Sequence, residues 1–431
     1  MLRRARAAGA AVVLLAAACL GLLPAPPSAA AGAPAAADVN REPGWSADDI
    51  REEQRWVLEA LNVEEAWRVT RGAGVTVALV DGSVDGGVAE LRGRVTVGPE
   101  LGPDDPGART GTPGEGEDSA TRHGTAMASL IAGGGTGGGR GLLGIAPEAR
   151  ILSLPLNFSG EDGTIPPEED VRTLRNSPVA RAIRYAADNG AQVVSMSLGA
   201  YGPHRAEREA VSYALSKGVV LVASVGNGGD SEYAAANATS FWNFPAGYSG
   251  VIGVGASGPA GEPAPFSSDN LSVLVSAPGV AVPVVLPGGE YGSSDGTSAS
   301  AALVAGVVAL IKAKYPDMSP QMVSRALTST AASASGAGYD DHLGFGVVDA
   351  GAALARAGEL AGAGRTPPAA TPPPVADEHH FGVGPLPEEP PRPGADPLHL
   401  WLYGAGLLLG VLAFAGAVVA LTRRSGAGGP A

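Results

Sequence analysis

Cysteine is nearly absent from this 431-residue sequence. The single Cys19 leaves no partner for an intramolecular disulfide and no second thiolate for a cysteine-based metal site. Basic residues are also few, because 29 Lys and Arg stand against 43 Asp and Glu, which gives a net charge of −14. That sign is wrong for a protein that binds phosphate backbones. The composition therefore disfavours disulfide-stapled folds, cysteine metal clusters and nucleic-acid binding.

Glycine and proline, in contrast, are abundant, with 64 and 36 residues. Their combined share is about double that of an average globular protein, but no Gly-X-Y period is present, which excludes collagen. Hydrophobic residues make up 45% of the chain, enough for a sizeable core. The length allows two or three domains, or one large α/β domain.

The N-terminus has the pattern of an export signal. Arg3, Arg4 and Arg6 precede an apolar run over residues 10–23, and small residues suited to cleavage follow near Ala30. We expect a signal peptide over residues 1–30 and an N-terminal extension over 31–47. An uncleaved membrane anchor is the alternative, although the run is short for a membrane span.

The C-terminus has the pattern of a membrane anchor. Residues 398–421 contain one ionisable side chain, His399, and are long enough to cross a hydrocarbon core of about 30 Å. Arg423 and Arg424 follow, so the positive-inside rule places residues 422–431 in the cytoplasm and everything before the helix outside the cell. Residues 365–397 are proline-rich and predict an extended stalk. A buried core helix is the alternative for 398–421.

Between these ends, short apolar runs alternate with helical patterns. Runs bounded by helix breakers and typical of strands buried on both faces cover residues 75–80, 151–156, 191–198, 218–225 and 250–256. Helical patterns cover residues 123–132, 168–188, 204–217, 298–314 and 320–328. This alternation predicts an α/β domain over 48–364, with a mostly parallel sheet flanked by helices on both faces.

Three residues at strand or helix ends could form a nucleophilic site. Asp81 ends one predicted strand, His123 opens one predicted helix and Ser298 opens another. A serine hydroxyl needs a base to remove its proton, and the base works best when a carboxylate fixes its tautomer. Asn227 directly follows the strand over 218–225, where its amide could donate to an oxyanion together with the backbone N–H of Ser298.

Five segments carry a resemblance to a known family: VTVALVD, RHGTAMASLIAG, VVSMSLG, VASVGN and DGTSASAALVAG. In this order they resemble the signature segments of the subtilisin-like serine proteases, and the order Asp, His, Ser also matches. The resemblance implies a serine endopeptidase that acts on protein or peptide substrates through Asp81, His123, Ser298 and the oxyanion donor Asn227. It further implies that Ser197, Leu198 and Gly199 bind the substrate backbone and line the specificity pocket. No cofactor is implied for the chemistry, and calcium is implied only as an optional structural ion.

The expected arrangement of signal peptide, protease domain, stalk, membrane helix and basic tail indicates one group within this family. It resembles that of the mycosins, membrane-anchored subtilisin-like proteases of actinobacterial type VII secretion systems. This resemblance implies a single-pass protein of the cell membrane with an extracellular peptidase domain, and type VII secretion machinery as a partner.

One departure from the family pattern affects the catalytic aspartate. The family usually follows this residue with a small hydroxylated residue and then glycine, whereas Asp81 is followed by Gly82 and Ser83. An altered turn would favour a second interpretation, a catalytically degenerate subtilase that binds peptide or supports a secretion complex. A lipase or esterase is disfavoured, because Ser298 lies in GTSAS and not in a Gly-x-Ser-x-Gly elbow.

Overall fold

The computed structural model describes residues 38–41, 44–101, 115–156, 177–332, 338–363 and 397–425. The expected signal peptide lies outside these residues, as do the stalk up to residue 396 and the last six residues of the tail. The chain divides into two compact units, residues 1–366 and 367–431, which are described separately.

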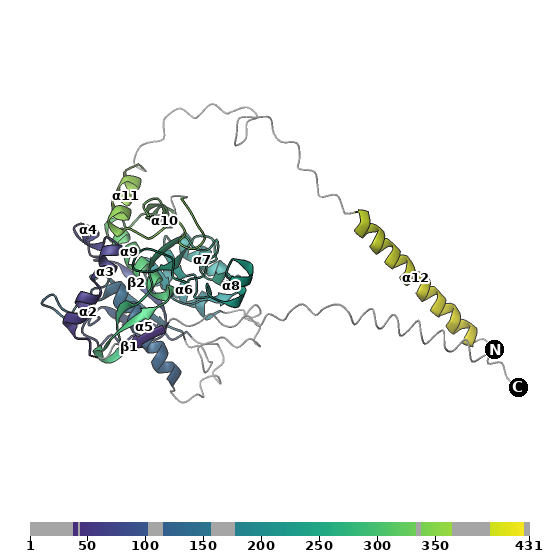
Figure 1. The fold of residues 1–431 in the computed structure, drawn as a ribbon, viewed down its shortest axis with the longest axis horizontal. Helices are drawn as coiled ribbons and strands as arrows, with labels where there is room; N and C mark the ends of the chain where they lie inside the picture. Colours follow the sequence, from purple (N-terminus) through teal and green to yellow (C-terminus); the bar gives the residue numbers. More distant parts are fainter. Residues whose placement is uncertain are drawn as a thin grey trace, which may run out of the picture. The chain divides into compact units, whose positions relative to one another are not determined.

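A seven-stranded sheet forms the centre of the first unit (Figure 1). Its strand order is β10-β9-β7-β5-β2-β4-β3, and every neighbouring pair is parallel. In chain order the strands are β2 (Thr76–Asp81), β3 (Val95–Val97), β4 (Arg150–Pro155), β5 (Val193–Met196), β7 (Val220–Ser224), β9 (Val251–Ser257) and β10 (Val275–Pro278). Functional side chains that follow these strands therefore gather at one edge.

Helices cover both faces of the sheet because alternate strand residues point to opposite sides. Val77 and Leu79 of β2 join the hydrophobic core that contains α5 (Glu115–Ala132), α9 (Thr297–Lys314), α10 (Pro320–Thr328) and α11 (Ala350–Ala363). Ala78 and Val80 join the opposite core with α6 (Pro178–Asp188) and α7 (Arg205–Ser216). The predicted fold class is thereby confirmed.

Two smaller antiparallel sheets complete this unit. One has the order β1-β12-β11, formed by Asp38–Arg41, Tyr291–Asp295 and Val282–Val285. The other pairs β6 (Ala200–Tyr201) with β8 (Asn243–Phe244). Strand β1 falls in the expected N-terminal extension and pairs with β12, which runs directly toward Ser298.

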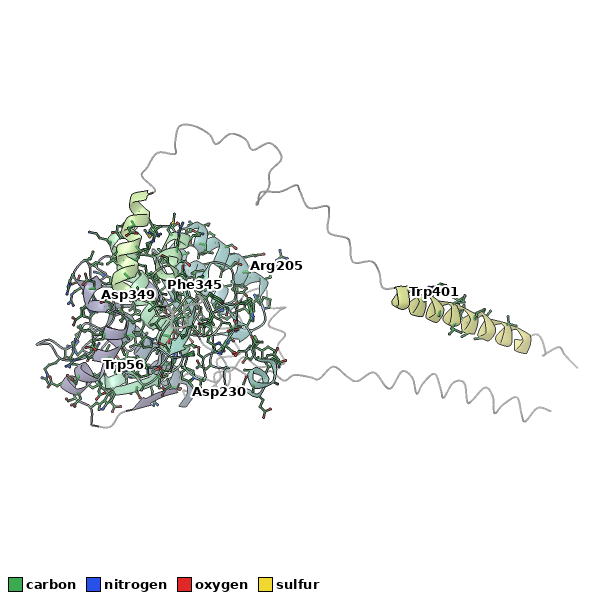
Figure 2. All side chains as sticks on the ribbon, turned by 45° about the horizontal axis from the view of Figure 1, so that its top comes forward. Trp56, Arg205, Asp230, Phe345, Asp349 and Trp401 are labelled. Atoms are coloured by element: carbon green, nitrogen blue, oxygen red, sulfur yellow. The ribbon has the colours of Figure 1, made fainter. Side chains whose placement is uncertain are left out.

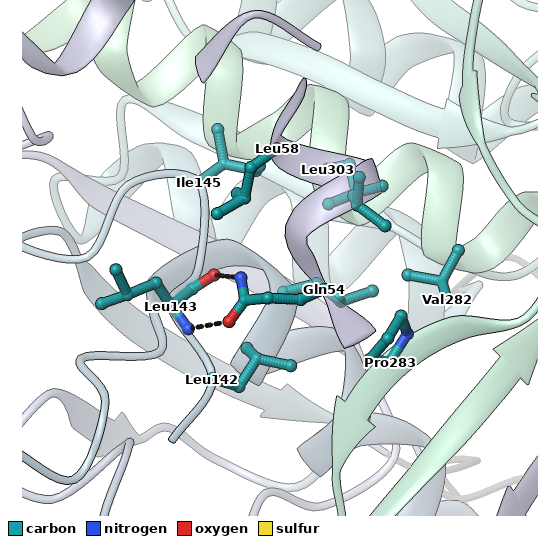
Figure 3. A pocket seen from close by; sticks show the side chains of 10 residues that line it. Gln54, Leu58, Leu142, Leu143, Ile145, Val282, Pro283 and Leu303 are labelled. Carbon is teal, nitrogen blue, oxygen red and sulfur yellow. Dashed lines mark hydrogen bonds between the residues drawn. The ribbon is translucent and has the colours of Figure 1, made fainter. Parts of the chain in front are cut away.

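The N-terminal helices pack onto the core of the first unit through a buried glutamine. After the short helix α2 (Ala47–Glu53), Gln54 precedes α3 (Arg55–Ala60), and α4 (Val63–Trp67) follows. The Gln54 side chain donates to the Leu143 carbonyl at 3.0 Å and accepts from its N–H at 2.7 Å, among apolar side chains that include Leu58 and Leu303 (Figure 3). These two bonds tie the N-terminal helices to the end of the glycine-rich segment over residues 133–144.

One helix start differs from the sequence prediction, and another is described only in part. Helix α5 begins at Glu115, so His123 lies in its third turn and does not open it. The added turns are polar and carry no apolar periodicity, which is why the sequence did not reveal them. Helix α6 begins at Pro178 after the N-cap Ser177, and residues 168–176 of the expected helix lie outside the described residues.

In the second unit, the described residues form one helix, α12 (Pro397–Ser425), which carries Trp401 near its start (Figure 2). It contains the 15-residue apolar stretch Ala405–Val419. By length and composition, the described helix that could cross a membrane is α9, but 89% of it is buried, so it is a core helix of the first unit. Membrane crossing by residues 398–421 remains a prediction.

Candidate active site

Asp81 ends the central strand β2, where it is 5% exposed. Its Oδ1 accepts from the Gly82 N–H at 2.6 Å and lies 2.7 Å from Nδ1 of His123. Its Oδ2 is buried without a hydrogen-bond partner among the described residues. The carboxylate therefore directs one oxygen at the imidazole, which fixes the ring orientation.

His123 is held over Asp81 by α5. Burial lowers the pKa of His123, and the negative charge of Asp81 and the hydrogen bond to it raise the pKa. The net effect raises it above the ordinary value of 6.5, because the carboxylate favours the imidazolium. With Nδ1 directed at Asp81, Nε2 is the ring nitrogen left to exchange a proton elsewhere.

Gly82, the departure from the family pattern, is required by close packing. A Cβ at this position would lie 2.1 Å from the carbonyl oxygen of Ala120 and 2.4 Å from its carbonyl carbon. The early turns of α5 thus pass directly over the Asp81 turn. The altered turn does not prevent the contact between Asp81 and His123.

Gly82→Ala is expected to lower the free energy of unfolding by about 1–3 kcal/mol, because the new methyl group must displace helix backbone. Denaturant unfolding of the full chain measures this change. The control is Gly362→Ala in α11, where no atom lies within 4 Å of an added Cβ and alanine favours the helix. Equal stability of the two variants would contradict the close packing.

Ser298 is the second residue of α9 and is 6% exposed. Its Oγ donates to the Ser197 carbonyl at 3.4 Å, and the Ser197 Oγ donates to the Ser298 carbonyl at 3.1 Å. The helix N-cap is Gly296, so neither Thr297 nor Ser298 is used as a side-chain cap. The expected substrate-binding segment Ser197, Leu198, Gly199 therefore begins in direct contact with the expected nucleophile.

Asn227 is oriented by a residue that the sequence analysis did not assign. Its Oδ1 accepts from both the backbone N–H and the hydroxyl of Thr297, each at 2.9 Å. The Thr297 hydroxyl in turn accepts from the Gly226 N–H at 3.2 Å. Because Oδ1 is held by Thr297, the amide NH₂ is the donor end of the side chain. The position of Thr297 beside Ser298 in DGTSAS was the signal that could have identified it.

The sheet brings these residues to one edge. Asp81 ends β2, Ser197 follows β5, and these strands are adjacent, with Val80 opposite Met196. Asn227 follows β7, the neighbour of β5. Among the described residues no hydrogen bond joins His123 to Ser298. Such bonds are often long in unliganded enzymes and tighten when substrate binds.

The described residues contain no group of three or more His, Cys, Asp or Glu side chains placed to hold a metal ion. Calcium stays an optional structural ion that the sequence resemblance implies, and the same resemblance implies no cofactor for the chemistry.

Comparison with known proteins decides the family. The sequence profile of the subtilase family matches residues 72–346, which contain Asp81, His123, Asn227 and Ser298. The chain belongs to the subtilase family. The predicted family and enzyme class, a subtilisin-like serine endopeptidase, are confirmed at this level.

Individual relatives agree with this assignment. The subtilase is 33% identical to fervidolysin of Fervidobacterium pennivorans, over 73% of this chain but 46% of that protein. It is 32% identical to mycosin-1 of Mycolicibacterium smegmatis, over 69% of this chain and 72% of that protein. It also matches the crystal structure of MycP1 from the ESX-1 type VII secretion system, with 27% identity, a TM-score of 0.58, and coverage of 75% of this chain and 90% of that one. The predicted likeness to mycosins is confirmed.

Proposed function

We propose that this subtilase is a membrane-anchored extracellular endopeptidase that hydrolyses peptide bonds through an acyl-enzyme. The 2.7 Å contact between His123 Nδ1 and Asp81 Oδ1, at the sheet edge that also holds Ser298, is the observation that carries the proposal. A buried carboxylate in this position keeps the imidazole in the tautomer that can accept a proton at Nε2.

The proposed reaction proceeds in two steps. Ser298 Oγ attacks the carbonyl carbon of the scissile bond while its proton passes to His123 Nε2. The oxyanion accepts hydrogen bonds from the Asn227 amide and the Ser298 N–H. His123 then protonates the leaving amine, and a water molecule, deprotonated by the same imidazole, releases the acyl group from Ser298. Asp81 stays ionised throughout and stabilises the imidazolium.

Labelling with a fluorophosphonate probe tests this proposal. The full chain is expected to be labelled on Ser298, and the Ser298→Ala variant is expected to lose the label with its fold intact. The absence of labelling from a folded wild-type chain would favour the alternative, a degenerate subtilase that binds peptide or supports a secretion complex.

The activity is expected to rise with pH. His123 must be neutral to accept a proton, and its pKa is raised above 6.5, so half-maximal kcat/KM is expected above pH 6.5. The stability of the fold changes with pH in the opposite direction. Because the pKa of His123 is higher in the folded chain than in the unfolded chain, protonation of His123 stabilises the fold. This stabilisation is complete below the pKa of the unfolded chain and is lost as the pH rises through the pKa of the folded chain. Rates and unfolding curves from pH 5 to 9 measure both, and a flat rate profile would contradict the role of His123.

The proposed location rests on α12. A 29-residue helix at about 1.5 Å per residue exceeds a hydrocarbon core of about 30 Å, and its described apolar residues are exposed. We place the peptidase domain outside the cell and the basic tail inside. The test is membrane fractionation of the full chain beside a chain ending at residue 396, which should become soluble. Retention of the truncated chain in the membrane after an alkaline wash would contradict anchoring by α12.

The proposed partner is a type VII secretion system. The likeness to mycosin-1 and to MycP1 of the ESX-1 system supports this assignment. Deletion of the gene should then impair export of the system's substrates, and the Ser298→Ala variant separates a proteolytic from a structural role.

A further inference from the structure

The tyrosine that begins β12 is bonded to a buried glutamate from the segment that follows Asp81. Glu90 is 1% exposed and Tyr291 is 9% exposed. The Tyr291 hydroxyl donates to Glu90 Oε1 at 2.8 Å. Glu90 lies nine residues after Asp81, and Tyr291 lies seven residues before Ser298. This hydrogen bond therefore joins the chain that leaves the expected aspartate to the strand that leads to the expected nucleophile.

The surroundings of this bond make its loss costly. Burial and the Glu90 carboxylate raise the pKa of Tyr291, so the hydroxyl keeps its proton and remains the donor. Arg51 of α2 lies near enough to Glu90 to interact with its negative charge. A buried carboxylate that loses a donor has no water to replace it, so the loss costs more than it would at the surface. The bond is therefore expected to hold the two segments at a fixed distance.

The hairpin formed by β11 and β12 is fastened at two further points. The Val285 N–H donates to Ser129 Oγ at 3.1 Å, and the Gly288 N–H donates to Asp85 Oδ2 at 2.9 Å. Ser129 lies in α5, the helix that carries His123, and Asp85 belongs to the segment that follows β2. The hairpin is thus bonded to both parts of the chain that supply the other members of the expected triad.

Strand β12 carries the position of its first residue toward Ser298. It is paired on both edges, with β1 and with β11. An extended strand cannot lengthen appreciably, because full extension is about 3.3–3.6 Å per residue. Beyond the strand, the Gly296 N–H donates to the Gly279 carbonyl and the Thr297 N–H to Asn227 Oδ1, each at 2.9 Å. A shift at the start of β12 is therefore expected to disturb these bonds and displace Ser298.

We propose that Glu90 is a positioning residue, which through its hydrogen bond to Tyr291 fixes β12 and thereby the distance from Ser298 to His123. This proposal rests on the proposed peptidase function. Glu90 and Tyr291 are both buried, so they act on the reaction through the placement of Ser298. A displacement of about 1 Å at a reacting group can cost on the order of a hundredfold in rate.

Steady-state kinetics of the full chain with a peptide substrate test the proposal. Tyr291→Phe removes the donor alone and is expected to lower kcat at least about tenfold while KM stays within about twofold. The matched control is Tyr248→Phe, which removes a hydroxyl that donates to the buried Glu207 at 3.2 Å in the opposite core. It should leave kcat within about twofold of the wild type. An unchanged kcat in Tyr291→Phe, or an equal loss in both variants, overturns the proposal.

A conservative change at the glutamate separates the hydrogen bond from general packing. Glu90→Gln keeps a side-chain oxygen that can accept from Tyr291, so it is expected to retain kcat within about threefold of the wild type. A loss in Glu90→Gln as large as that in Tyr291→Phe overturns the proposal, because the acceptor would then have no role.

Hydrogen exchange tests the same placement without hydrolysis. The N–H groups of Gly296 and Thr297 are hydrogen-bonded, so their exchange reports how firmly the segment before Ser298 is held. Exchange at least about tenfold faster in Tyr291→Phe than in the wild type and in Tyr248→Phe supports the proposal, even if a fluorophosphonate probe labels neither chain. Equal exchange in all three chains overturns it, even if Ser298 of the wild type is labelled.

Discussion

Replacement of His123 by alanine is expected to lower kcat for peptide hydrolysis by about a millionfold, the size of loss known for subtilisin, a member of the same family. Without the imidazole, Ser298 has no base to accept its proton, and the leaving amine has no acid. The change is measured as the single-turnover rate with a peptide substrate. Residual activity from binding and the oxyanion donors should remain above that of water.

Two further variants make this result specific. His342→Ala should retain the wild-type kcat, because this imidazole is exposed and contacts Asp341 and Asp269. The double variant of His123→Ala and Ser298→Ala should lose no more than either single variant, because the two groups act as a unit. Additive losses would show that His123 acts independently of Ser298.

Asp81→Asn is expected to lower kcat by about ten-thousandfold, as the same change does in other Ser-His-Asp proteases. An asparagine that donates from its NH₂ group to Nδ1 places the imidazole proton on Nε2 and blocks proton transfer from Ser298. Loss of the negative charge also removes the interaction that raises the pKa of His123. The pH at half-maximal activity should therefore fall along with the rate.

The control for this charge change is Asp188→Asn at the end of α6, where the exposed carboxylate accepts from Tyr213. It should alter neither kcat nor its pH dependence. If Asp81→Asn lowered the rate without lowering the pH at half-maximal activity, the charge of Asp81 would not control the imidazole.

The parallel sheet could be predicted because its strands are buried on both faces and appear as continuous apolar runs. The short edge strand β3 (Val95–Val97) could not, since Thr96 and Val97 are exposed. The pairing of β1 with β12 joins residues 257 positions apart, such as Asp38 and Asp295, and local patterns carry no information about it.

The candidate site likewise has features that the sequence predicts and features that it does not. Asp81, His123, Asn227 and Ser298 can be predicted as site residues from the segments that contain them. The position of His123 in the third turn of α5 could not be predicted, because the turns before it carry no apolar periodicity. The role of Gly82 likewise depends on an approach of Ala120 that only the folded chain reveals.

The pairing of β1 with β12 joins segments that the ribosome makes at very different times. Ribosomes make residues 38–41 early and Tyr291–Asp295 some 250 residues later, so the strand that leads into Ser298 gains this neighbour only when most of the chain exists. Contacts between such distant segments form slowly, because a long loop must close first. In a nascent chain, Asp81 and His123 are therefore present well before the strand that leads into Ser298 can pair with β1.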